Sequence, residues 1–593
     1  MGRTVRFISF LRGQAEYCGL LPSDEKTAGA SSARLLTVLV LLALVVRGVM
    51  ALLLTSVCDD AHFYMSLAKA LNAGDLQQVF SYLSLNIYPP LLAGLSRLGG
   101  DWMLVAKLWG VVISSLAVLP LYGFTRRVFD ARIAAAAGFL YVLHPGLVEL
   151  SVEPVRESTF WFLFLLGLYL SWRSVEERSW LLFALNGVVI ALAIHTRTEG
   201  WLLVPALVYW AFVTGWENRP YRSGLALGTV LCLLMTPLLI LTVNVTLLQG
   251  HSRWELGRME HLSMGLVWLS SLSGSESEPP QRPAPVWDTP PINAAPTAVG
   301  PAAAAVPVAD SAADAVAEKS PGRLMALLGY VLLYFRAVCS AIEPLYLLLT
   351  GVGLYCGRQH LLERRRIVLS LLVAAVMGAV CVYAGFTIVS LNRMQINDRY
   401  FFTAMLAWLP FTGIGLLASI EWLRQLKWFL PPHQQRGMLV APVLLGVMML
   451  TGTADAWSST HGKREAEARL GAWLGEHYGP IETVVSNTAG VRAGYFVTGR
   501  LPESESSSHP LQELVVTRNP DLVIIGTRRM KQPHKDRLVR YVTESTEPPL
   551  QRATVPEEFS DFVVLQSARL VARQAAAKKT VLTAGNTSAR SAH

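Results

Sequence analysis

Long apolar runs separated by short charged segments recur along most of this chain of 593 residues. An α-helix needs roughly 20 apolar residues to cross the hydrocarbon core of a bilayer, and by that length there are about eleven candidate spans. They lie near 35–57, 103–123, 133–148, 158–172, 180–195, 200–215, 224–248, 341–357, 367–389, 401–420 and 438–454. The pattern predicts an all-α polytopic membrane protein.

Composition supports this prediction. Hydrophobic residues make up 52% of the chain and charged residues only 16%, whereas a soluble domain carries about 25% charged residues. A lipid-facing surface explains the deficit, which a larger soluble core does not. The first apolar run, 35–57, is longer than the roughly 7–15 residues of a signal-peptide core, so we expect it to span rather than to be cleaved.

The positive charges predict the orientation of the chain. Arg3, Arg6, Arg12 and Arg34 precede the first run, which places the segment 1–34 in the cytoplasm. Every second loop after that is basic, as the positive-inside rule requires; these loops hold Arg126, Arg127, Arg132, Arg173, Arg178, Arg219, Arg222, Arg358, Arg364, Arg365, Arg366, Arg424, Lys427 and Arg436. The net charge of +9 is therefore explained without nucleic acid as a partner.

Two long segments within the predicted membrane domain, 35–455, are not predicted to cross the membrane. The first outer loop, 59–101, contains an amphipathic stretch from His62 to Ala73 that we expect to lie in the membrane interface, followed by Tyr88-Pro89-Pro90, which should break any helix. The segment 249–323 is rich in Pro, Ala and Ser and is expected to be a flexible outer loop. Residues 322–339 are apolar but contain Arg336, which favours an interfacial or re-entrant segment.

The C-terminal part changes pattern. A helix-like stretch at 463–476 is followed by short apolar strands at 483–485, 521–526 and 562–565, which predicts a small α/β domain over 456–568. By the number of spans, this domain lies outside the membrane. The basic, small-residue segment 569–593 is predicted to be a disordered tail.

Charged residues also gather at the predicted outer face, where the positive-inside rule does not explain arginines. Burying them in lipid alone is costly, so they should face one another, water or a ligand. The set is Asp59, Asp60, His62, Lys107, His144, Glu149, Glu153, Arg156, Glu157, His195, Arg197, Glu199, Arg393, Asp398 and Arg399. Asp59-Asp60 stands out because it directly follows the first predicted helix, and the helix dipole disfavours acids at a C-terminal end.

This mixture of side chains points to a class of chemistry. A carboxylate can deprotonate a hydroxyl or hold a metal, and arginine is suited to bidentate binding of phosphate. A reaction that uses both is the transfer of a group away from a lipid phosphate. The acidic pair is compatible with a divalent metal, but no cluster of histidines and carboxylates marks one.

Four motifs resemble those of the type-C (GT-C) membrane glycosyltransferases, in the subgroup of the protein mannosyltransferases and aminoarabinose transferases. They are Asp59-Asp60-Ala61-His62-Phe63-Tyr64, Tyr88-Pro89-Pro90-Leu91, Thr196-Arg197-Thr198-Glu199-Gly200 and Asp398-Arg399-Tyr400-Phe401-Phe402. The resemblance covers residues 35–455 in helix order and loop lengths. The long outer loop and the C-terminal α/β domain depart from it.

The resemblance implies a polyprenyl-phosphate-linked sugar as donor and a one-step, inverting transfer. Asp60, four residues before Tyr64, would activate the acceptor with Asp59 as helper, and Glu153 or Glu157 would supply a second acid. Arg399 would bind the lipid phosphate. The supporting substrate-binding residues would be Arg197, Arg393, Lys107, Tyr64, Glu199 and Tyr400.

Other interpretations of the same residues stay open at this point. Arg399 can pair with Asp398 at the surface, Arg197 and Glu199 can clamp their own turn, and Lys107 can reach toward the headgroups. A secondary transporter or a non-catalytic scaffold is the alternative class, although transporters place such charges near the midplane. The acceptor can be protein, lipid or glycan, and we expect a bacterial inner membrane with the active site outside.

Overall fold

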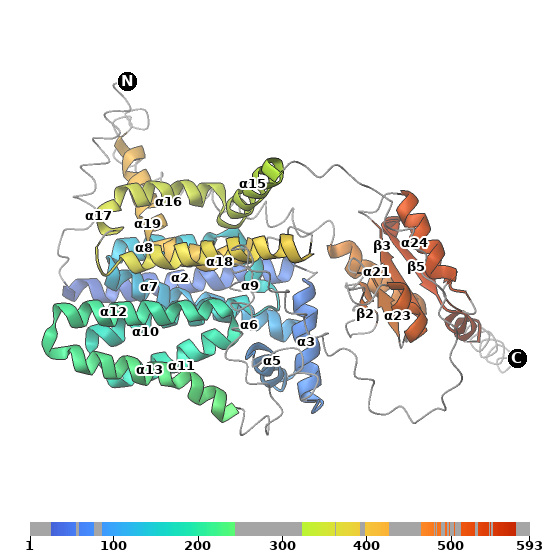
Figure 1. Cartoon of the computed structure of the whole chain (residues 1–593), viewed down its shortest axis with the longest axis horizontal. Coiled ribbons are helices and arrows are strands. Elements are labelled where there is room, and N and C mark those ends of the chain that lie inside the picture. The colour runs from blue at the N-terminus through green and yellow to red at the C-terminus, as the bar shows by residue number, and fades with distance from the viewer. Residues whose placement is uncertain are drawn as a thin grey trace, which may run out of the picture.

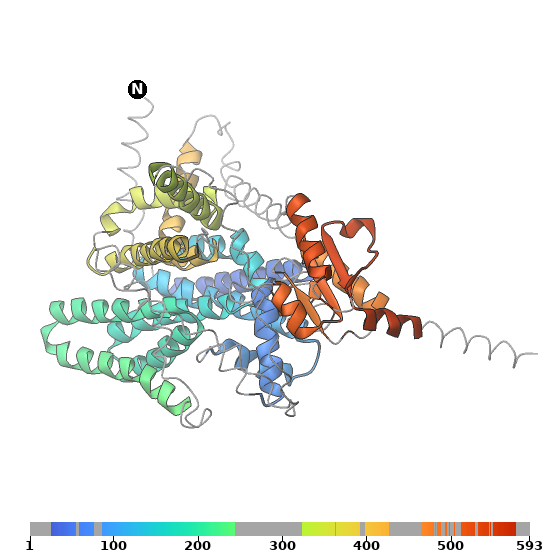
Figure 2. The same cartoon turned by 45° about the vertical axis from the view of Figure 1, so that its right-hand side comes forward.

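The computed structural model describes residues 25–54, 58–75, 86–243, 323–361, 363–391, 398–425 and 464–576, with short gaps within the last range at 479–480, 482, 488–492, 495–496, 498–502, 505–510, 528–531, 545 and 547–548. Figures 1 and 2 show a bundle of helices up to residue 425 and a smaller unit, containing a sheet, beside it. The flexible loop predicted at 249–323 lies almost entirely outside the described residues, as do Arg393 and the predicted span at 438–454.

Helices cover the predicted spans that the structure describes. Those of the first half are α2 (Glu25–Leu53), α3 (Asp59–Asn72), α5 (Tyr88–Ser96), α6 (Trp102–Leu116), α7 (Val118–Val128), α8 (Ala131–Leu143), α9 (Pro145–Val152), α10 (Glu157–Glu177), α11 (Trp180–Thr196), η1 (Thr198–Leu202), α12 (Leu203–Glu217), η2 (Arg219–Tyr221) and α13 (Arg222–Val243). They are followed by α15 (Arg323–Ile342), α16 (Pro344–Cys356), α17 (Arg358–Leu361), α18 (Ile367–Leu391), η5 (Asp398–Phe401) and α19 (Phe402–Gln425). By length and composition, four described helices can cross a membrane, or six if each of two bent pairs forms one span.

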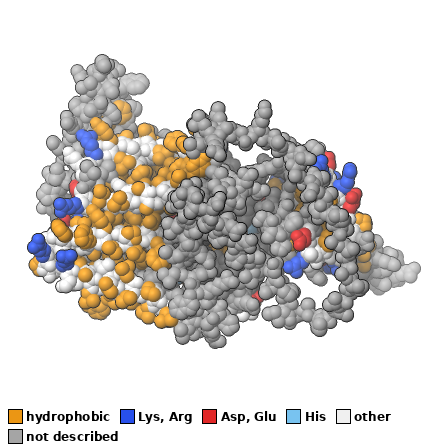
Figure 3. Space-filling model, in the orientation of Figure 1, with side chains coloured by type: hydrophobic (Ala, Val, Ile, Leu, Met, Phe, Trp, Pro, Cys, Tyr) orange, Lys and Arg blue, Asp and Glu red, His pale blue; other side chains and the backbone are white. Residues whose placement is uncertain are grey.

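The outer surface of the bundle is apolar. On α2, Val38, Leu41, Val45, Val49 and Leu52 are exposed at the spacing of one helical face. Figure 3 shows hydrophobic side chains over the visible face of the bundle and Lys and Arg gathered at one end of it. This distribution is that of a protein whose apolar band meets lipid and whose basic loops share one side.

Both bent pairs occur where a proline begins a new helix. α8 and α9 meet at 56° around His144, and α15 and α16 meet at 90° around Glu343, whose φ of +68° is uncommon for a residue with a Cβ. The bend at Glu343 is consistent with the re-entrant alternative predicted for 322–339, and equally with a broken span. α16 then packs against α19 so closely that a Cβ on Gly353 would lie 1.8 Å from the Phe411 carbonyl oxygen.

Two local expectations for the first outer loop are wrong. α2 ends at Leu53, and Asp59-Asp60 begins α3 with Cys58 as its N-cap, so the acids lie at the favourable end of a helix dipole rather than at the unfavourable one. Pro89 and Pro90 lie in the first turn of α5, where the missing N–H groups have no helical partner to lose. The prolines therefore start a helix here.

The C-terminal unit has a five-stranded sheet in the order β2-β1-β3-β5-β4. Its elements are α21 (Arg464–Tyr478), β1 (Val484–Ser486), β2 (Glu503–Ser504), α23 (Leu511–Arg518), β3 (Leu522–Gly526), α24 (Gln532–Glu544), β4 (Gln551–Arg552), η8 (Glu557–Phe559) and β5 (Phe562–Gln566). β1 pairs in parallel with β2 and β3, and β5 pairs antiparallel to β3 and β4.

Alternation along the strands gives this sheet two buried faces. Leu522 and Ile524 pack with α21, whereas Val523 and Ile525 pack with α23 and α24, as a side-chain period of two requires. The predicted disordered tail is wrong at its start, because residues 568–576 are helical. Leu570 is 1% exposed in the core beside α21, and that burial holds the helix to the sheet.

Candidate functional site

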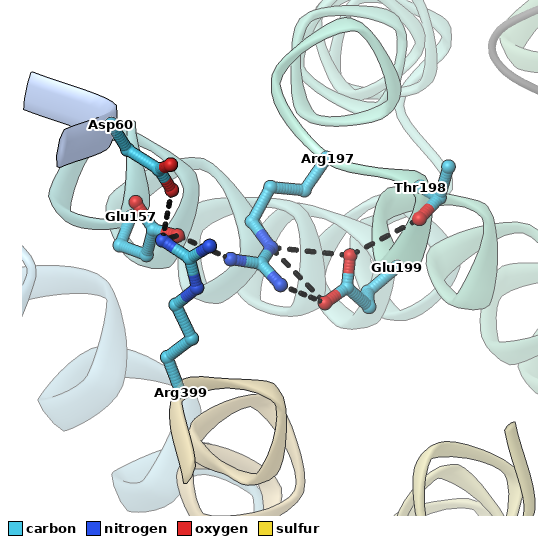
Figure 4. Close-up of polar contacts among 6 residues, drawn as sticks. All are labelled: Asp60, Glu157, Arg197, Thr198, Glu199 and Arg399. Atoms are coloured by element: carbon cyan, nitrogen blue, oxygen red, sulfur yellow. Dashed lines mark hydrogen bonds and ion pairs between the residues drawn. The ribbon is translucent and has the colours of Figure 1, made fainter. Parts of the chain in front are cut away.

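An ion pair joins the first outer loop to the start of α19. Arg399 donates through Nη1 to Oδ2 of Asp60, a residue 339 positions away in the chain. The side chain of Asp60 is 40% exposed and that of Arg399 is 22% exposed, so this pair is the solvent-accessible edge of the cluster in Figure 4. Asp59 lies in the same first turn of α3, but its side chain lies outside the described part of the structure.

Glu157 lies between two arginines. Its Oε1 is 2.6 Å from Nη1 of Arg197 and 3.6 Å from Nη1 of Arg399. The side chains of Glu157 and Arg197 are only 2% and 4% exposed. Since a buried charge is stable only when paired, Glu157 explains how two arginines can point into one apolar interior (Figure 4).

Arg197 also holds Glu199 across the turn between α11 and α12. Arg197 Nε donates to both carboxylate oxygens of Glu199 at 3.0 and 3.2 Å, and Nη2 donates at 2.5 Å. Burial alone would raise the pKa of Glu199, but the charge and hydrogen bonds of Arg197 lower it below its usual value. The clamp that the sequence left as an alternative is therefore present, and it orients Arg197 toward Glu157.

Gly200 makes this turn possible. A Cβ at this position would lie 2.5 Å from the backbone N of Ile194 and 2.6 Å from the carbonyl carbon of Ala193. No side chain can occupy that space without moving the backbone. The glycine of the Thr-Arg-Thr-Glu-Gly motif thus lets η1 fold back against the end of α11.

Aromatic rings line the arginines. The Tyr400 ring centroid is 5.5 Å from Cζ of Arg197 and 5.9 Å from Cζ of Arg399, within the range of cation–π attraction. On the other side of the cluster, Cζ of Arg156 is 5.8 Å from the Tyr64 ring centroid, and that ring is 5.3 Å from the ring of Tyr88.

Lys107 and Glu153 form a separate polar group. Nζ of Lys107 donates to the carbonyl oxygen of Leu54 at 2.5 Å, directly after α2, and the residue is only 9% exposed. Glu153 is 1% exposed. Burial first, and then the Glu153 charge, raise the pKa of the Cys58 thiol. Glu157 is thus linked to Asp60 through Arg399, whereas Glu153 lies near Cys58. Lys107 is bonded to Leu54 and does not extend toward the headgroups.

The cluster does not fit a metal centre. Over the residues that the structure describes, no three His, Cys, Asp or Glu side chains are grouped to hold an ion. Asp60, Glu157 and Glu199 each contact an arginine instead. These carboxylates are neutralised by cations of the protein itself.

Three polar residues, two of them buried and one half-buried, had no role assigned from the sequence. Arg47, in the middle of α2, is 0% exposed and donates to the carbonyl oxygens of Tyr141 and Val142 where α8 ends. An arginine inside an apolar run was the available signal. Tyr88 and Arg156 are the others; the sequence placed Arg156 on the outer side, but nothing in its spacing distinguished it from its neighbours.

Comparisons with known proteins agree with the motifs. Residues 87–241 match the family model described as dolichyl-phosphate-mannose-protein mannosyltransferase. A dolichyl-phosphooligosaccharide-protein glycotransferase of Archaeoglobus fulgidus is 28% identical over 144 residues, which is 21% of this chain and 17% of that protein. The match thus spans about a sixth of the curated relative's length.

Solved structures resemble the whole chain. ArnT from Cupriavidus metallidurans, bound to undecaprenyl phosphate, aligns with a TM-score of 0.53 at 14% identity, over 90% of this chain and 98% of that one. An Archaeoglobus fulgidus oligosaccharyltransferase in complex with Zn and sulfate aligns with a TM-score of 0.47 at 13% identity, over 83% of this chain and 68% of that one.

The matches and the apolar helices indicate an integral membrane protein that is similar to the glycosyltransferases of the GT-C superfamily. The fold that it shares with ArnT agrees with this similarity. The resemblance inferred from the four motifs is thereby confirmed. Within the superfamily, the chain is similar to the protein mannosyltransferases over residues 87–241 and has the fold of ArnT.

Proposed function

We propose that the protein transfers a sugar from a polyprenyl-phosphate-linked donor to an acceptor on the outer side of a bacterial inner membrane, with Asp60 activating the acceptor. The observation that carries this proposal is the continuous network from Asp60 through Arg399, Glu157 and Arg197 to Glu199. It joins the first outer loop, α10, the turn after α11 and the start of α19. Undecaprenyl phosphate in the ArnT structure supports a lipid phosphate as the leaving group.

Exposure separates the roles of the two acids. The side chain of Asp60 is 40% exposed and that of Glu157 only 2% exposed. An acceptor hydroxyl or amine can reach Asp60 from outside the membrane, and a proton taken up there can leave to water. Glu157 is held by Arg197 and acts as the residue that keeps both arginines in place. We therefore retain Asp60 as the acceptor-activating residue and assign Glu157, rather than Glu153, to its support.

The reaction then balances as a single displacement. The acceptor heteroatom attacks the anomeric carbon while its proton passes to the Asp60 carboxylate, and the bond between that carbon and the phosphate oxygen breaks. The electron pair leaves with the lipid phosphate, whose charge Arg399 stabilises. Attack opposite the leaving group inverts the anomeric centre.

The ion pair between Asp60 and Arg399 orders these events. A phosphate offers Arg399 a bidentate partner with more negative charge than one carboxylate, so the donor competes with Asp60 for the guanidinium. Once the phosphate is bound to Arg399, Asp60 is released toward the acceptor. Without a donor, Arg399 occupies the carboxylate.

The distribution of charged side chains supports one side of the membrane for the site. Arg127 with Glu176 and Arg365 with Glu217 form half-exposed ion pairs on loops assigned to the cytoplasm, and the cluster lies at the opposite ends of the helices that bear them. This supports an outward-facing site and about eleven spans in total. It also supports an outward C-terminal domain, since that domain follows the last predicted span.

Transfer is tested with purified full-length protein and a panel of radiolabelled undecaprenyl-phosphate-linked sugars, by following release of undecaprenyl phosphate. We expect D60N to lower the rate by roughly 10²–10⁴-fold, the usual contribution of general acid–base catalysis. The matched control is D101N, since Asp101 caps α6 through Leu104 N and asparagine caps equally well. If D59N and D60N together leave transfer at the wild-type rate, the proposed role of the acidic pair is wrong.

A further inference from the structure

Beside the Asp60–Arg399 pair, three buried polar groups point to a ligand that the ion pairs do not explain. Within the described part of the chain, Nε and Nη1 of Arg156, the hydroxyl of Tyr88 and Oε2 of Glu157 are buried without a hydrogen-bond partner. Tyr88 is 0% exposed and Glu157 is 1% exposed. Leaving such atoms unsatisfied costs about 1–3 kcal/mol each, so four of them on three side chains need an explanation.

These groups come from different elements and share a neighbour. The Tyr64 ring contacts two of the side chains: its centroid is 5.8 Å from Cζ of Arg156 and 5.3 Å from the ring of Tyr88. Arg156 precedes Glu157 directly in the chain. Burial and then the charge of Glu157 raise the pKa of the Tyr88 hydroxyl.

The type of each open atom limits what can bind. Arg156 offers two N–H donors, Tyr88 offers a hydroxyl, and Glu157 Oε2 is an acceptor. A phosphate accepts hydrogen bonds but has none to donate to Glu157, and its charge is repelled there. An ammonium group satisfies Glu157 but is repelled by Arg156. A hydroxyl both donates and accepts, so neighbouring hydroxyls satisfy all three groups.

The net charge leads to the same ligand class. Asp60, Glu157 and Glu199 carry three negative charges, and Arg156, Arg197 and Arg399 carry three positive charges. The lipid phosphate takes the place of Asp60 at Arg399, but a second ion beside Arg156 and Glu157, whose charges are opposite, would have no partner. A neutral polyol avoids that cost in a buried site.

We propose that Arg156, Tyr88 and Glu157 Oε2 form a subsite that binds the hydroxyls of a neutral sugar, beside the Asp60–Arg399 pair. This proposal rests on the proposed function, because the bound sugar would be either the donor sugar that is transferred or an acceptor sugar that receives it. The subsite is distinct from the phosphate position at Arg399.

The test uses the full-length protein and measures affinity for undecaprenyl phosphate, for undecaprenyl-phosphate-linked mannose, glucose and galactose, and for the methyl glycosides of these sugars. If the subsite holds the donor sugar, at least one lipid-linked sugar binds more tightly than undecaprenyl phosphate. If it holds an acceptor sugar, a methyl glycoside binds or raises Tm instead. In either case R156M should weaken that binding by about tenfold or more, the value of a hydrogen bond to a charged group, and Y88F should weaken it by roughly threefold to tenfold, the value of a neutral one.

Y88F guards against a folding artefact, because it removes a buried hydroxyl that has no partner among the described residues. It should therefore not lower the Tm of the ligand-free protein. Y122F is the matched control: the Tyr122 hydroxyl in α7 is likewise buried without a described partner, and its loss should leave every affinity unchanged.

Three results would overturn the subsite. The first is that no probe sugar adds affinity to the wild type, and the second is that Y88F retains the full sugar-dependent gain in affinity. The third is that R156M weakens the binding of undecaprenyl phosphate as much as that of its sugar-linked forms. The last result makes Arg156 a phosphate ligand and leaves the proposed transfer intact. Conversely, a sugar-dependent gain together with full transfer by D60N would preserve the subsite and refute the role of Asp60.

Discussion

Replacing Glu157 with glutamine should destabilise the protein more than any change to a surface ion pair. The substitution keeps the shape of the side chain but leaves Arg197, whose side chain is 4% exposed, without the carboxylate 2.6 Å away. Breaking a buried pair in this way costs about 3–5 kcal/mol because a charge remains uncompensated. Arg197 keeps Glu199, and Arg399 keeps Asp60, so we expect the lower part of that range.

The assay is thermal unfolding of the detergent-solubilised full chain, followed by tryptophan fluorescence. A loss of about 3 kcal/mol corresponds to a Tm lowered by roughly 2–4 °C for a chain of this length, because the entropy of unfolding scales with the number of residues. E176Q is the control, since Glu176 lies 2.5 Å from Arg127 with 47% of its side chain exposed, and such pairs contribute about 0–1 kcal/mol. If both variants lower Tm equally, burial is not what makes the Glu157 pair important, and the reasoning fails.

Two further predictions concern the turn after α11. G200A should lower both Tm and sugar transfer, because its Cβ meets backbone atoms at 2.5 and 2.6 Å, and overpacking of this kind costs about 1–3 kcal/mol. G224A is the control and should be neutral, because a Cβ there has nothing within 4 Å. Equal effects of the two substitutions would contradict the steric explanation. Since the pKa of Glu199 is lowered from 4.5 by Arg197, its contribution to stability is complete above pH 4.5 and is lost as the pH falls through the lower folded value. The Tm difference between wild type and E199Q should therefore be constant at neutral pH and shrink in acid; a difference that grows in acid would mean the opposite shift.

Much of the helical architecture was predictable from length alone, because a bilayer admits few ways to satisfy backbone hydrogen bonds. The same holds for the charged outer residues. Asp60, Arg197, Glu199 and Arg399 are far apart in sequence, yet their cost in lipid predicts that they meet, and the structure brings them into one network.

Other features depend on backbone details that a hydropathy pattern does not contain. Glu153 and Glu157 are equally acidic and equally close to the predicted helix. Glu153 follows α9 in an extended conformation whereas Glu157 begins α10, and only that difference directs one toward Cys58 and the other toward Arg197. Likewise, because the first helix ends at Leu53 and a new one begins at Asp59, the acidic pair lies at the N-terminus of α3 and not at the C-terminus of α2.

Arg399 has two carboxylate neighbours of unequal exposure, and in the reaction that we propose this asymmetry would link donor binding to catalysis. A lipid phosphate arriving from the membrane would have to draw Arg399 from Asp60, which is 40% exposed and would become hydrated when released. Glu157, at 2% exposed, cannot be hydrated in the same way, but it keeps Arg197 and so remains neutralised. The network can thus give up one carboxylate without leaving a buried charge, and the carboxylate it gives up is the one that the acceptor can reach.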